Sequence, residues 1–407
     1  MNVLHVIASM DPKQGGVSQA VSTMIAGSAE QGITNEVTNL DAPDAPWNKA
    51  APFITHALGP GRGPWQYSTK LIPWLVANLA RFDAVILHGL WLYHGYALRQ
   101  ALRRLQRQQP AAGSPKIPVP RFFVMPHGML DPYFQKAPDR KLKALRNWIY
   151  WRLFERKMIA YADAILFTCE TECLLSRNSF SPYQPKRELV VGLGVEQPPT
   201  YMPAMREAFL TKCPECADRP YLLFLSRLHE KKGVDLLLRA YGQLARDQAF
   251  SAQTFPALVI AGPGLETPYG EGLRQLAAEL PVPATVLFPG MLTGAAKWGA
   301  FYNCQAFVLP SHQENFGIAV VEALACGNPV LISNQVNIWR EIESAGGGII
   351  AADTLAGTQH LLGHWYQLPE LAKRAIGEQA RDAYHKYFTI ELATTKLATA
   401  LTGATDL

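Results

Sequence analysis

The sequence contains little cysteine and little charge, and it lacks a long hydrophobic run. Six cysteines in 407 residues are too few for the disulfide framework of a small secreted protein. Charged residues make up 17% of the chain and hydrophobic residues 48%, which excludes an intrinsically disordered protein. No uncharged apolar run approaches the roughly 20 residues that a membrane-spanning helix needs. Residues 1–8 show a buried-strand pattern without the basic start of a signal peptide, so we expect a cytoplasmic protein.

Metal-binding signals are also scarce. Cys213 and Cys216 have CxxC spacing, but no second pair follows, so a surface turn is favoured over zinc or redox chemistry. We find no Asp-x-Asp motif of the kind that holds a divalent cation beside a diphosphate. We therefore expect no cofactor and no metal.

The length and the pattern predict two α/β domains. A chain of 407 residues exceeds one ordinary domain, and short apolar runs alternate with helical patterns, as in parallel sheets. Pro198 and Pro199 favour an extended connector, so we place a domain boundary near residue 200. The expected strands are Val3–Ala8, Ala84–Leu87, Phe122–Met125, Ala164–Phe167, Leu189–Val191, Tyr221–Leu225, Ala257–Ala261, Thr285–Phe288, Ala306–Leu309 and Val330–Ile332.

Two carboxylates eight residues apart form the most informative motif. Glu314 follows an apolar strand that ends at Pro310, and Glu322 lies in a helix-forming run that opens at Gly317. Ligands of open parallel sheets bind where a strand ends and a helix begins. At about 1.5 Å per helical residue, the two carboxylates lie at most about 12 Å apart, comparable with the span from a hexose to a ribose across a diphosphate. Capping residues on a solvated face would give the same spacing.

A second group of candidates comes from the loops that follow other expected strands. Arg227 and Lys232 would place two cations beside a helix start, which suits a diphosphate, although a solvated basic loop is the usual alternative. The glycines of two further loops would let the backbone approach a phosphate or sugar closely. The alternative interpretation of each loop is a tight turn with no ligand. A lone loop histidine, His127, is more often structural. The glycines are Gly15, Gly16, Gly262 and Gly264.

The segment around Glu314 and Glu322 resembles the E-x7-E signature of retaining glycosyltransferases of family 4. That resemblance covers nearly the whole chain and implies the GT-B architecture, two Rossmann-like domains of the α/β class facing across a cleft. The implied domains are 1–200 on the acceptor side, 201–382 for the nucleotide sugar, and a helix at 383–407 that returns to the first domain.

The resemblance also assigns roles to residues. It implies catalytic roles for His127, Arg227, Lys232 and Glu314, with Arg227 and Lys232 as the diphosphate clamp. Glu322 would bind the ribose hydroxyls, and His127 would hydrogen-bond the donor sugar. The remaining implied donor-binding residues are Gly15, Gly16, Gly262, Gly264, Met291, Leu292, Asn315, Phe316, Gly317 and Ile318. One departure is Val191–Glu196, where many members carry a Pro-Asn-Gly-Val-Asp sequence.

The resemblance implies a retaining hexosyltransferase that uses UDP-glucose by preference, and the cations Arg227 and Lys232 in place of a metal motif make metal independence the expectation. The expected acceptor is a polysaccharide or a lipid-linked oligosaccharide, and nucleic acid is not an expected partner. A nucleotide-sugar epimerase, which would need no acceptor, and a silent sugar-nucleotide-binding protein are the alternatives.

A basic, aromatic segment suggests a membrane contact. Residues 136–157 contain eight basic and two acidic residues, and the N-terminal 200 residues carry 22 Lys and Arg against 14 Asp and Glu. Such a helix can lie on an anionic bilayer, with Trp148, Tyr150 and Trp151 at headgroup depth. Alternatively, Leu142, Leu145, Ile149 and Phe154 would be core contacts beneath a solvated basic face, which the helical spacing slightly favours.

Overall fold

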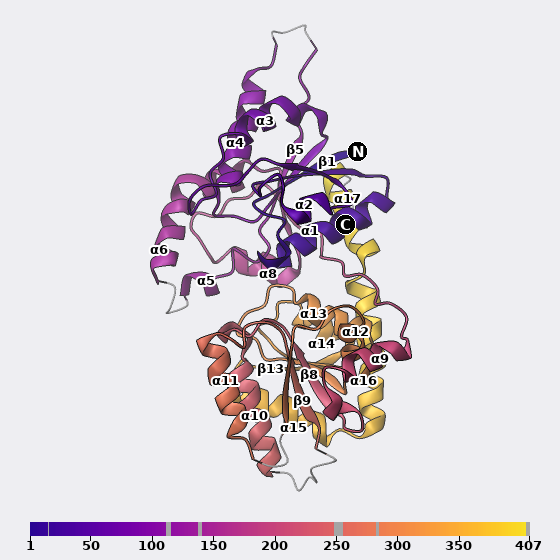
Figure 1. Cartoon of the computed structure of the whole chain (residues 1–407). Coiled ribbons are helices and arrows are strands. Elements are labelled where there is room, and N and C mark those ends of the chain that lie inside the picture. Colours follow the sequence, from indigo (N-terminus) through magenta and orange to yellow (C-terminus); the bar gives the residue numbers. More distant parts are fainter. Residues whose placement is uncertain (15, 111–114, 137–140, 248–254, 282–284, 404–407) are drawn as a thin grey trace. The chain divides into compact units, whose positions relative to one another are not determined.

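The chain forms two compact units, each built on a parallel β-sheet (Figure 1). The computed structural model describes residues 1–14, 16–110, 115–136, 141–247, 255–281 and 285–403. The N-terminal unit comprises Met1–Gly194 and Ile390–Leu407, and the C-terminal unit comprises Val195–Thr389. The predicted α/β class with two Rossmann-like domains is confirmed.

The N-terminal unit contains a seven-stranded sheet in the order β3-β2-β1-β4-β5-β6-β7. Its central strands are largely apolar, as expected where helices cover both faces, and every residue of the central strand Ala84–His88 is buried. The order reverses between β1 and β4, which makes their carboxyl ends the topological switch point. The strands are β1 (Asn2–Ile7), β2 (Thr34–Asn39), β3 (Ile54–Ala57), β4 (Ala84–His88), β5 (Arg121–Met125), β6 (Ala164–Phe167) and β7 (Glu188–Val190).

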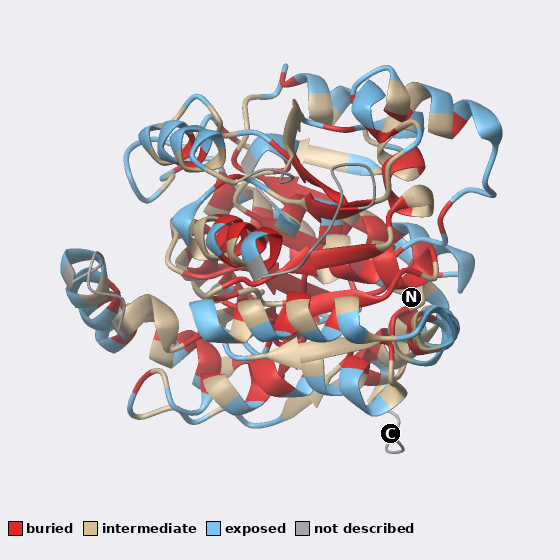
Figure 2. Cartoon of the chain, turned by 90° about the horizontal axis from the view of Figure 1, so that it is seen from below, coloured by how far each residue is buried: buried red, intermediate tan, exposed pale blue. Residues whose placement is uncertain are grey.

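Helices pack on both faces of this sheet. Over the chain as a whole, buried residues follow the strands and the inner sides of the helices (Figure 2). One face carries α1 (Gly16–Glu30) and α17 (Ile390–Thr402), which meet where Gly27 leaves no room for a Cβ atom against Ile390 and Thr394. The other helices of the unit are α2 (Pro46–Lys49), α3 (Leu71–Asn78), α4 (Tyr93–Arg107), α5 (Tyr133–Lys136), α6 (Lys141–Tyr150), α7 (Arg156–Tyr161) and α8 (Glu170–Ser176).

The C-terminal unit contains a six-stranded parallel sheet in the order β10-β9-β8-β11-β12-β13, with its switch point between β8 and β11. Its strands are β8 (Tyr221–Leu225), β9 (Ala257–Ala261), β10 (Val286–Gly290), β11 (Ala306–Leu309), β12 (Val330–Ser333) and β13 (Gly348–Ala351). Its helices are α9 (Pro203–Leu210), α10 (Val234–Asp247), α11 (Pro268–Ala278), α12 (Gly294–Asn303), α13 (Ile318–Ala325), α14 (Trp339–Ala345), α15 (Leu355–Gln367) and α16 (Glu370–Tyr387).

All ten expected strands are present, with ends that shift by a residue or two. The structure adds β2, β3 and β13, which the sequence pattern did not predict. The sequence of β2, TNEVTN, is too polar to be recognised as a buried strand. β3 and β13 have only four residues each and lie at the edges of their sheets, so their apolar pattern is short. The segment from residue 383 onward begins inside α16, and the part that joins the N-terminal unit starts at Ile390.

Candidate functional site

In the C-terminal unit, Lys232 and Glu314 meet at the switch point of the sheet. Lys232 lies on the loop after β8, Glu314 lies on the loop after β11, and these two strands are neighbours. The Lys232 ammonium forms an ion pair with the Glu314 carboxylate. Gly233 fixes this arrangement, because its φ is +65° and a Cβ atom there would collide with the Pro310 carbonyl.

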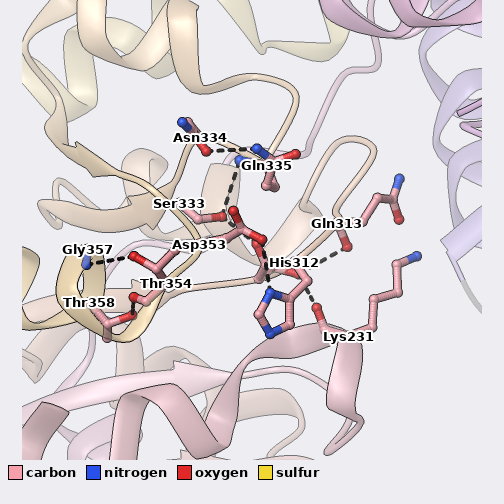
Figure 3. A network of polar contacts seen from close by, with 11 residues as sticks. Lys231, His312, Gln313, Ser333, Asn334, Gln335, Asp353, Thr354, Gly357 and Thr358 are labelled. Atoms are coloured by element: carbon pink, nitrogen blue, oxygen red, sulfur yellow. Dashed lines mark hydrogen bonds and ion pairs between the residues drawn. The ribbon is translucent and has the colours of Figure 1, made fainter. Parts of the chain in front are cut away.

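A polar network holds the loop that carries Glu314 (Figure 3). The Ser311 hydroxyl donates to the Lys231 carbonyl at 2.9 Å, and the Ser333 hydroxyl donates to the Ser311 carbonyl at 2.5 Å. The His312 ring nitrogen Nδ1 lies 3.0 Å from the Asp353 carboxylate. The network ties the loop after β11 to the loop after β8, to the last residue of β12 and to Asp353 after β13, so several neighbouring elements set the position of Glu314.

The ion pair controls the charge of Glu314. Burial would raise the pKa of this carboxyl and is the largest single influence, but the charge and hydrogen bond of Lys232, the charge of Lys231 and the Asn315 amide together lower the pKa below its usual value. Glu314 is therefore ionised at neutral pH, and Lys232 is only 8% exposed. A buried cation beside an ionised carboxylate can serve an anionic group and a hydroxyl at the same time.

Arg227 does not join this ion pair. Its side chain is exposed and makes no hydrogen bond or ion pair with any described residue. Gly262, on the loop after β9, packs so closely on the Ser226 carbonyl that a Cβ atom would not fit, and Gly264 packs on the Leu228 carbonyl. The two predicted glycines therefore brace the loop that carries Arg227.

Glu322 has a partner that the sequence did not indicate. Its carboxylate lies 2.6 Å from the Lys297 ammonium on α12. Burial raises the pKa of Glu322, and Lys297 opposes that rise. The two residues are 25 positions apart, which gives no helical spacing, so only the tertiary structure could reveal the pair.

The other predicted donor residues surround the start of α13 or follow β10. Gly317 precedes the helix with φ of +80°, Ile318 is its first residue, and Phe316 is buried against Phe388. Asn315 accepts a hydrogen bond from Asn337 at 3.4 Å. After β10, Met291 is 68% exposed whereas Leu292 is 5% exposed.

In the N-terminal unit, the loop after β1 is anchored by Asp41. The carboxylate of Asp41 accepts hydrogen bonds from the Ser9 hydroxyl at 2.6 Å, from the Met10 amide at 2.8 Å and from the Trp47 indole at 2.9 Å. This loop leads to Gly16, the exposed first residue of α1. Gly15 lies outside the described residues.

His127 occupies a strained position at the end of β5. Its φ is +52°, a conformation that costs a residue with a Cβ atom of order 1 kcal/mol or more. The buried Glu172 carboxylate holds this turn by accepting a hydrogen bond from the Gly128 amide at 2.5 Å and from the Thr168 hydroxyl at 2.6 Å. The sequence did not predict this role for Glu172, because Glu172 lies on α8, 45 positions further along the chain, and no local pattern links it to His127.

His127 is half-buried and contacts a second histidine. Its Nε2 atom lies 2.9 Å from Nδ1 of His88, and His88 in turn contacts His5. Burial lowers the pKa of His127 to about 4. His88 and His94 are each 1% exposed, and the His94 ring is hydrogen-bonded to the His88 carbonyl, so both histidines are packed inside the N-terminal unit.

The basic segment divides into exposed and buried parts. Leu142, Leu145 and Ile149 on α6 are 85%, 57% and 46% exposed, so the interpretation of these residues as core contacts is wrong. Trp148 is also exposed, whereas Tyr150 and Trp151 are buried, so the expectation that all three aromatics lie at a membrane surface is wrong for those two. The chain turns inward there because Trp151 stacks on Phe180. Residues 139 and 140 lie outside the described residues.

Among the described residues, no three His, Cys, Asp or Glu side chains are grouped as metal ligands would be. Cys213 and Cys216 are both buried free thiols, so the prediction that they lie in a turn at the surface is wrong. None of the described helices is both long and apolar enough to cross a membrane.

Comparison with known families shows two matches that together span most of the chain. The family model for glycosyl transferases group 1 matches residues 206–379, and the model for a glycosyl transferase 4-like domain matches residues 15–194.

Curated relatives match over part of their length. A D-inositol 3-phosphate glycosyltransferase of Frankia alni is 32% identical over 40% of this chain and 42% of that protein. One of Gordonia bronchialis is 28% identical over 54% of this chain and 46% of that protein. The chain thus matches less than half the length of these two relatives.

Solved structures share the fold. HepE of Anabaena, solved with UDP and glucose, superposes with a TM-score of 0.72 at 16% identity, over 99% of this chain and all of that one. A sucrose-phosphate synthase of Thermosynechococcus elongatus gives 0.68 at 18% identity, with both chains fully covered. WaaG, involved in lipopolysaccharide biosynthesis, gives 0.67 at 17% identity, over 99% of this chain and all of that one. These likenesses show the GT-B fold.

Proposed function

Since the chain belongs to the family 4-type glycosyltransferases with the GT-B fold, we propose that it is a retaining hexosyltransferase that uses a nucleotide sugar, UDP-glucose by preference. The observation that carries this proposal is the Lys232–Glu314 ion pair at the switch point of the C-terminal sheet. The Lys232 ammonium would bind the anionic diphosphate, and the Glu314 carboxylate would accept a hydrogen bond from a sugar hydroxyl. HepE, whose solved complexes contain UDP and glucose, supports the choice of donor.

In the proposed reaction the bond between the anomeric carbon and the diphosphate oxygen breaks. A new bond forms on the same face to the acceptor oxygen, and the acceptor proton moves to the departing phosphate. Arg227 and Lys232 stabilise the charge that grows on the leaving group, so the reaction needs no metal. No described carboxylate is assigned as a nucleophile, because Glu314 and Glu322 serve binding. When the nucleotide binds, Glu322 accepts hydrogen bonds from the ribose hydroxyls and gives up its ion pair with Lys297.

The acceptor is proposed to be a polysaccharide or a lipid-linked oligosaccharide at an anionic membrane surface. The exposed apolar face of α6, formed by Leu142, Leu145 and Ile149, supports a lipid surface, and Lys143 and Arg146 lie on the same helix. Inositol phosphate is the second candidate, because it is the acceptor printed in the names of the curated relatives.

One experiment tests donor, chemistry and acceptor together. Purified protein is incubated with a panel of UDP- and GDP-sugars, first alone and then with inositol 3-phosphate or lipid-linked oligosaccharide. We expect slow hydrolysis of UDP-glucose without acceptor, transfer to one acceptor, and an α-linked product by NMR. A β-linked product contradicts retention. Isomerisation of the donor without acceptor supports an epimerase, and binding without turnover supports a silent binding protein.

A further inference from the structure

Four polar side chains form a diagonal row across the N-terminal sheet. Asn35 lies on β2, His5 on β1, His88 on β4, and His127 directly beyond β5. The register pairs Asn35 with Val3, His5 with Ile86, and His88 with Met125. Each member of the row therefore lies one strand across and two residues further along than the one before, so all four side chains are on one face of the sheet.

Hydrogen bonds join the row from end to end. Asn35 Oδ1 lies 3.0 Å from His5 Nε2, His5 Nδ1 lies 2.9 Å from His88 Nε2, and His88 Nδ1 lies 2.9 Å from His127 Nε2. Asn35, His5 and His88 are at most 9% exposed. Water therefore has little access to the hydrogen bonds between them.

The asparagine fixes the direction of the first hydrogen bond. Its amide nitrogen donates to the Ile33 carbonyl at 3.0 Å and to the Ser28 hydroxyl at 3.0 Å. The Ser28 hydroxyl donates to the Ile25 carbonyl, so it can accept from the amide. Because a carbonyl only accepts, the Asn35 nitrogen must face Ile33, and its oxygen must face His5. His5 Nε2 consequently carries a proton.

The remaining protons follow from the neutrality of the rings. Burial lowers the pKa of His5 and of His127 to about 4 and that of His88 well below its usual value, so each ring carries one proton at neutral pH. His5 Nδ1 is then an acceptor, and His88 Nε2 must donate to it. His88 Nδ1 is in turn an acceptor, and His127 Nε2 must donate to it.

We propose that Asn35, His5 and His88 are positioning residues that hold His127 as its Nε2–H tautomer, so that its Nδ1 offers a lone pair to the substrate. Nδ1 of His127 has no hydrogen-bond partner among the described residues. A substrate hydroxyl must therefore donate to His127, and a group that only accepts is rejected. The row is no proton wire, because the Asn35 amide at its far end cannot take up a proton.

Histidine tautomers are measured directly by long-range proton–nitrogen NMR of the full chain labelled with 15N-histidine. In the unliganded wild type we expect His127 Nε2 to be protonated and Nδ1 to be bare. Asn35→Leu removes the acceptor and should leave His127 as a mixture of tautomers, whereas Asn35→Asp keeps an acceptor and should keep the wild-type tautomer. Ser28→Ala is the matched control, because Ile33 still fixes the amide.

A protonated Nδ1 on wild-type His127 overturns the proposal, and this result stands even if Asn35→Leu does not fold. An unchanged His127 spectrum in folded Asn35→Leu overturns it as well.

A second measurement concerns the substrate and rests on the proposed function. Among monodeoxy and monodeoxyfluoro forms of UDP-glucose, replacement of the hydroxyl that contacts His127 should raise KM equally with hydrogen or fluorine, because neither donates. Absence of any transfer refutes the proposed function and leaves the NMR result in place.

Discussion

At the scale of single residues, the charge at the C-terminal switch point depends on Lys232 more than on Arg227. Lys232 is buried and paired with Glu314, whereas Arg227 is exposed and makes no hydrogen bond or ion pair with any described residue. Sequence analysis gave the two cations the same role in a diphosphate clamp, but the structure places them in different environments. Removing Lys232 would leave the half-buried Glu314 carboxylate without its partner, which lowers stability as well as function.

We predict that Lys232→Ala and Arg227→Ala each lower turnover by on the order of a hundredfold or more, because both stabilise the departing diphosphate. Steady-state kinetics with UDP-glucose measure this, and circular dichroism checks the fold. Lys232→Ala should also lower Tm, whereas Arg227→Ala should not. Lys231→Ala is the matched control for a nearby lysine. Wild-type turnover in both variants would remove the clamp from the mechanism.

The two glutamates should separate nucleotide binding from sugar binding. Glu322→Gln should weaken affinity for UDP itself, because its proposed partners are ribose hydroxyls. Glu314→Gln should leave UDP affinity within about threefold, a difference below about 1 kcal/mol, and should impair transfer. Isothermal calorimetry with UDP and kinetics with UDP-glucose give the two readouts. An equal loss of UDP affinity in both variants contradicts this division of roles.

At the scale of elements, the basic segment changes character at its midpoint. α6 exposes its apolar residues, and the π-helical turn Trp151–Glu155 that follows buries Trp151 and Glu155. Glu155 accepts a hydrogen bond from the amide of Trp91, whose φ is +72°, and its second oxygen has no partner among the described groups. An exposed helix is therefore joined to a buried acid that supports a strained loop.

We predict that binding to anionic vesicles depends on the exposed half of the segment. Each basic group near an anionic surface contributes about 1 kcal/mol, so Lys143→Glu combined with Arg146→Glu should reduce co-sedimentation at low salt by at least tenfold. Leu142→Ser with Leu145→Ser should reduce it without a change of charge. Arg187→Glu on the same unit is the charge control. Undiminished binding in both double variants would exclude α6 as the contact.

Glu155 should make stability depend on pH. Burial raises its pKa to about 8, whereas the unfolded value is 4.5. Its contribution to stability is therefore complete below about pH 4.5 and declines as pH rises toward 8 and the buried group must ionise. Glu155→Gln keeps an acceptor for Trp91 and cannot ionise, so its Tm should exceed that of the wild type at pH 8.5 and match it more closely at pH 5. Parallel curves for both proteins across this range would contradict the assignment.

At the scale of the whole molecule, the chain crosses between its units twice. It leaves the N-terminal unit after Gly194 and returns at Ile390, where α17 covers the same sheet face as α1. Leu397 on α17 is 2% exposed in that core, although nearly 200 residues separate α17 from the rest of its unit.

We predict that Leu397→Ala destabilises the N-terminal unit alone, by about 2–5 kcal/mol. Hydrogen exchange should accelerate in β1, β4 and β5 and stay unchanged in β8 and β11. Lys396→Ala, on the same helix but only partly buried, is the control and should leave both sheets protected. Faster exchange in the C-terminal sheet would show that the two units unfold together.

The sequence by itself determined the α/β class, the two sheets, ten of the thirteen strands found in the described residues, and the loops that carry Lys232, Glu314 and His127. It could do so because apolar runs and glycine turns are local properties of the chain. Only the tertiary structure decided that Lys297 pairs with Glu322, that Glu172 holds His127, and that Asn35, His5 and His88 line up behind it. These contacts arise from strand register and helix packing, which join residues far apart in the chain and leave no local pattern.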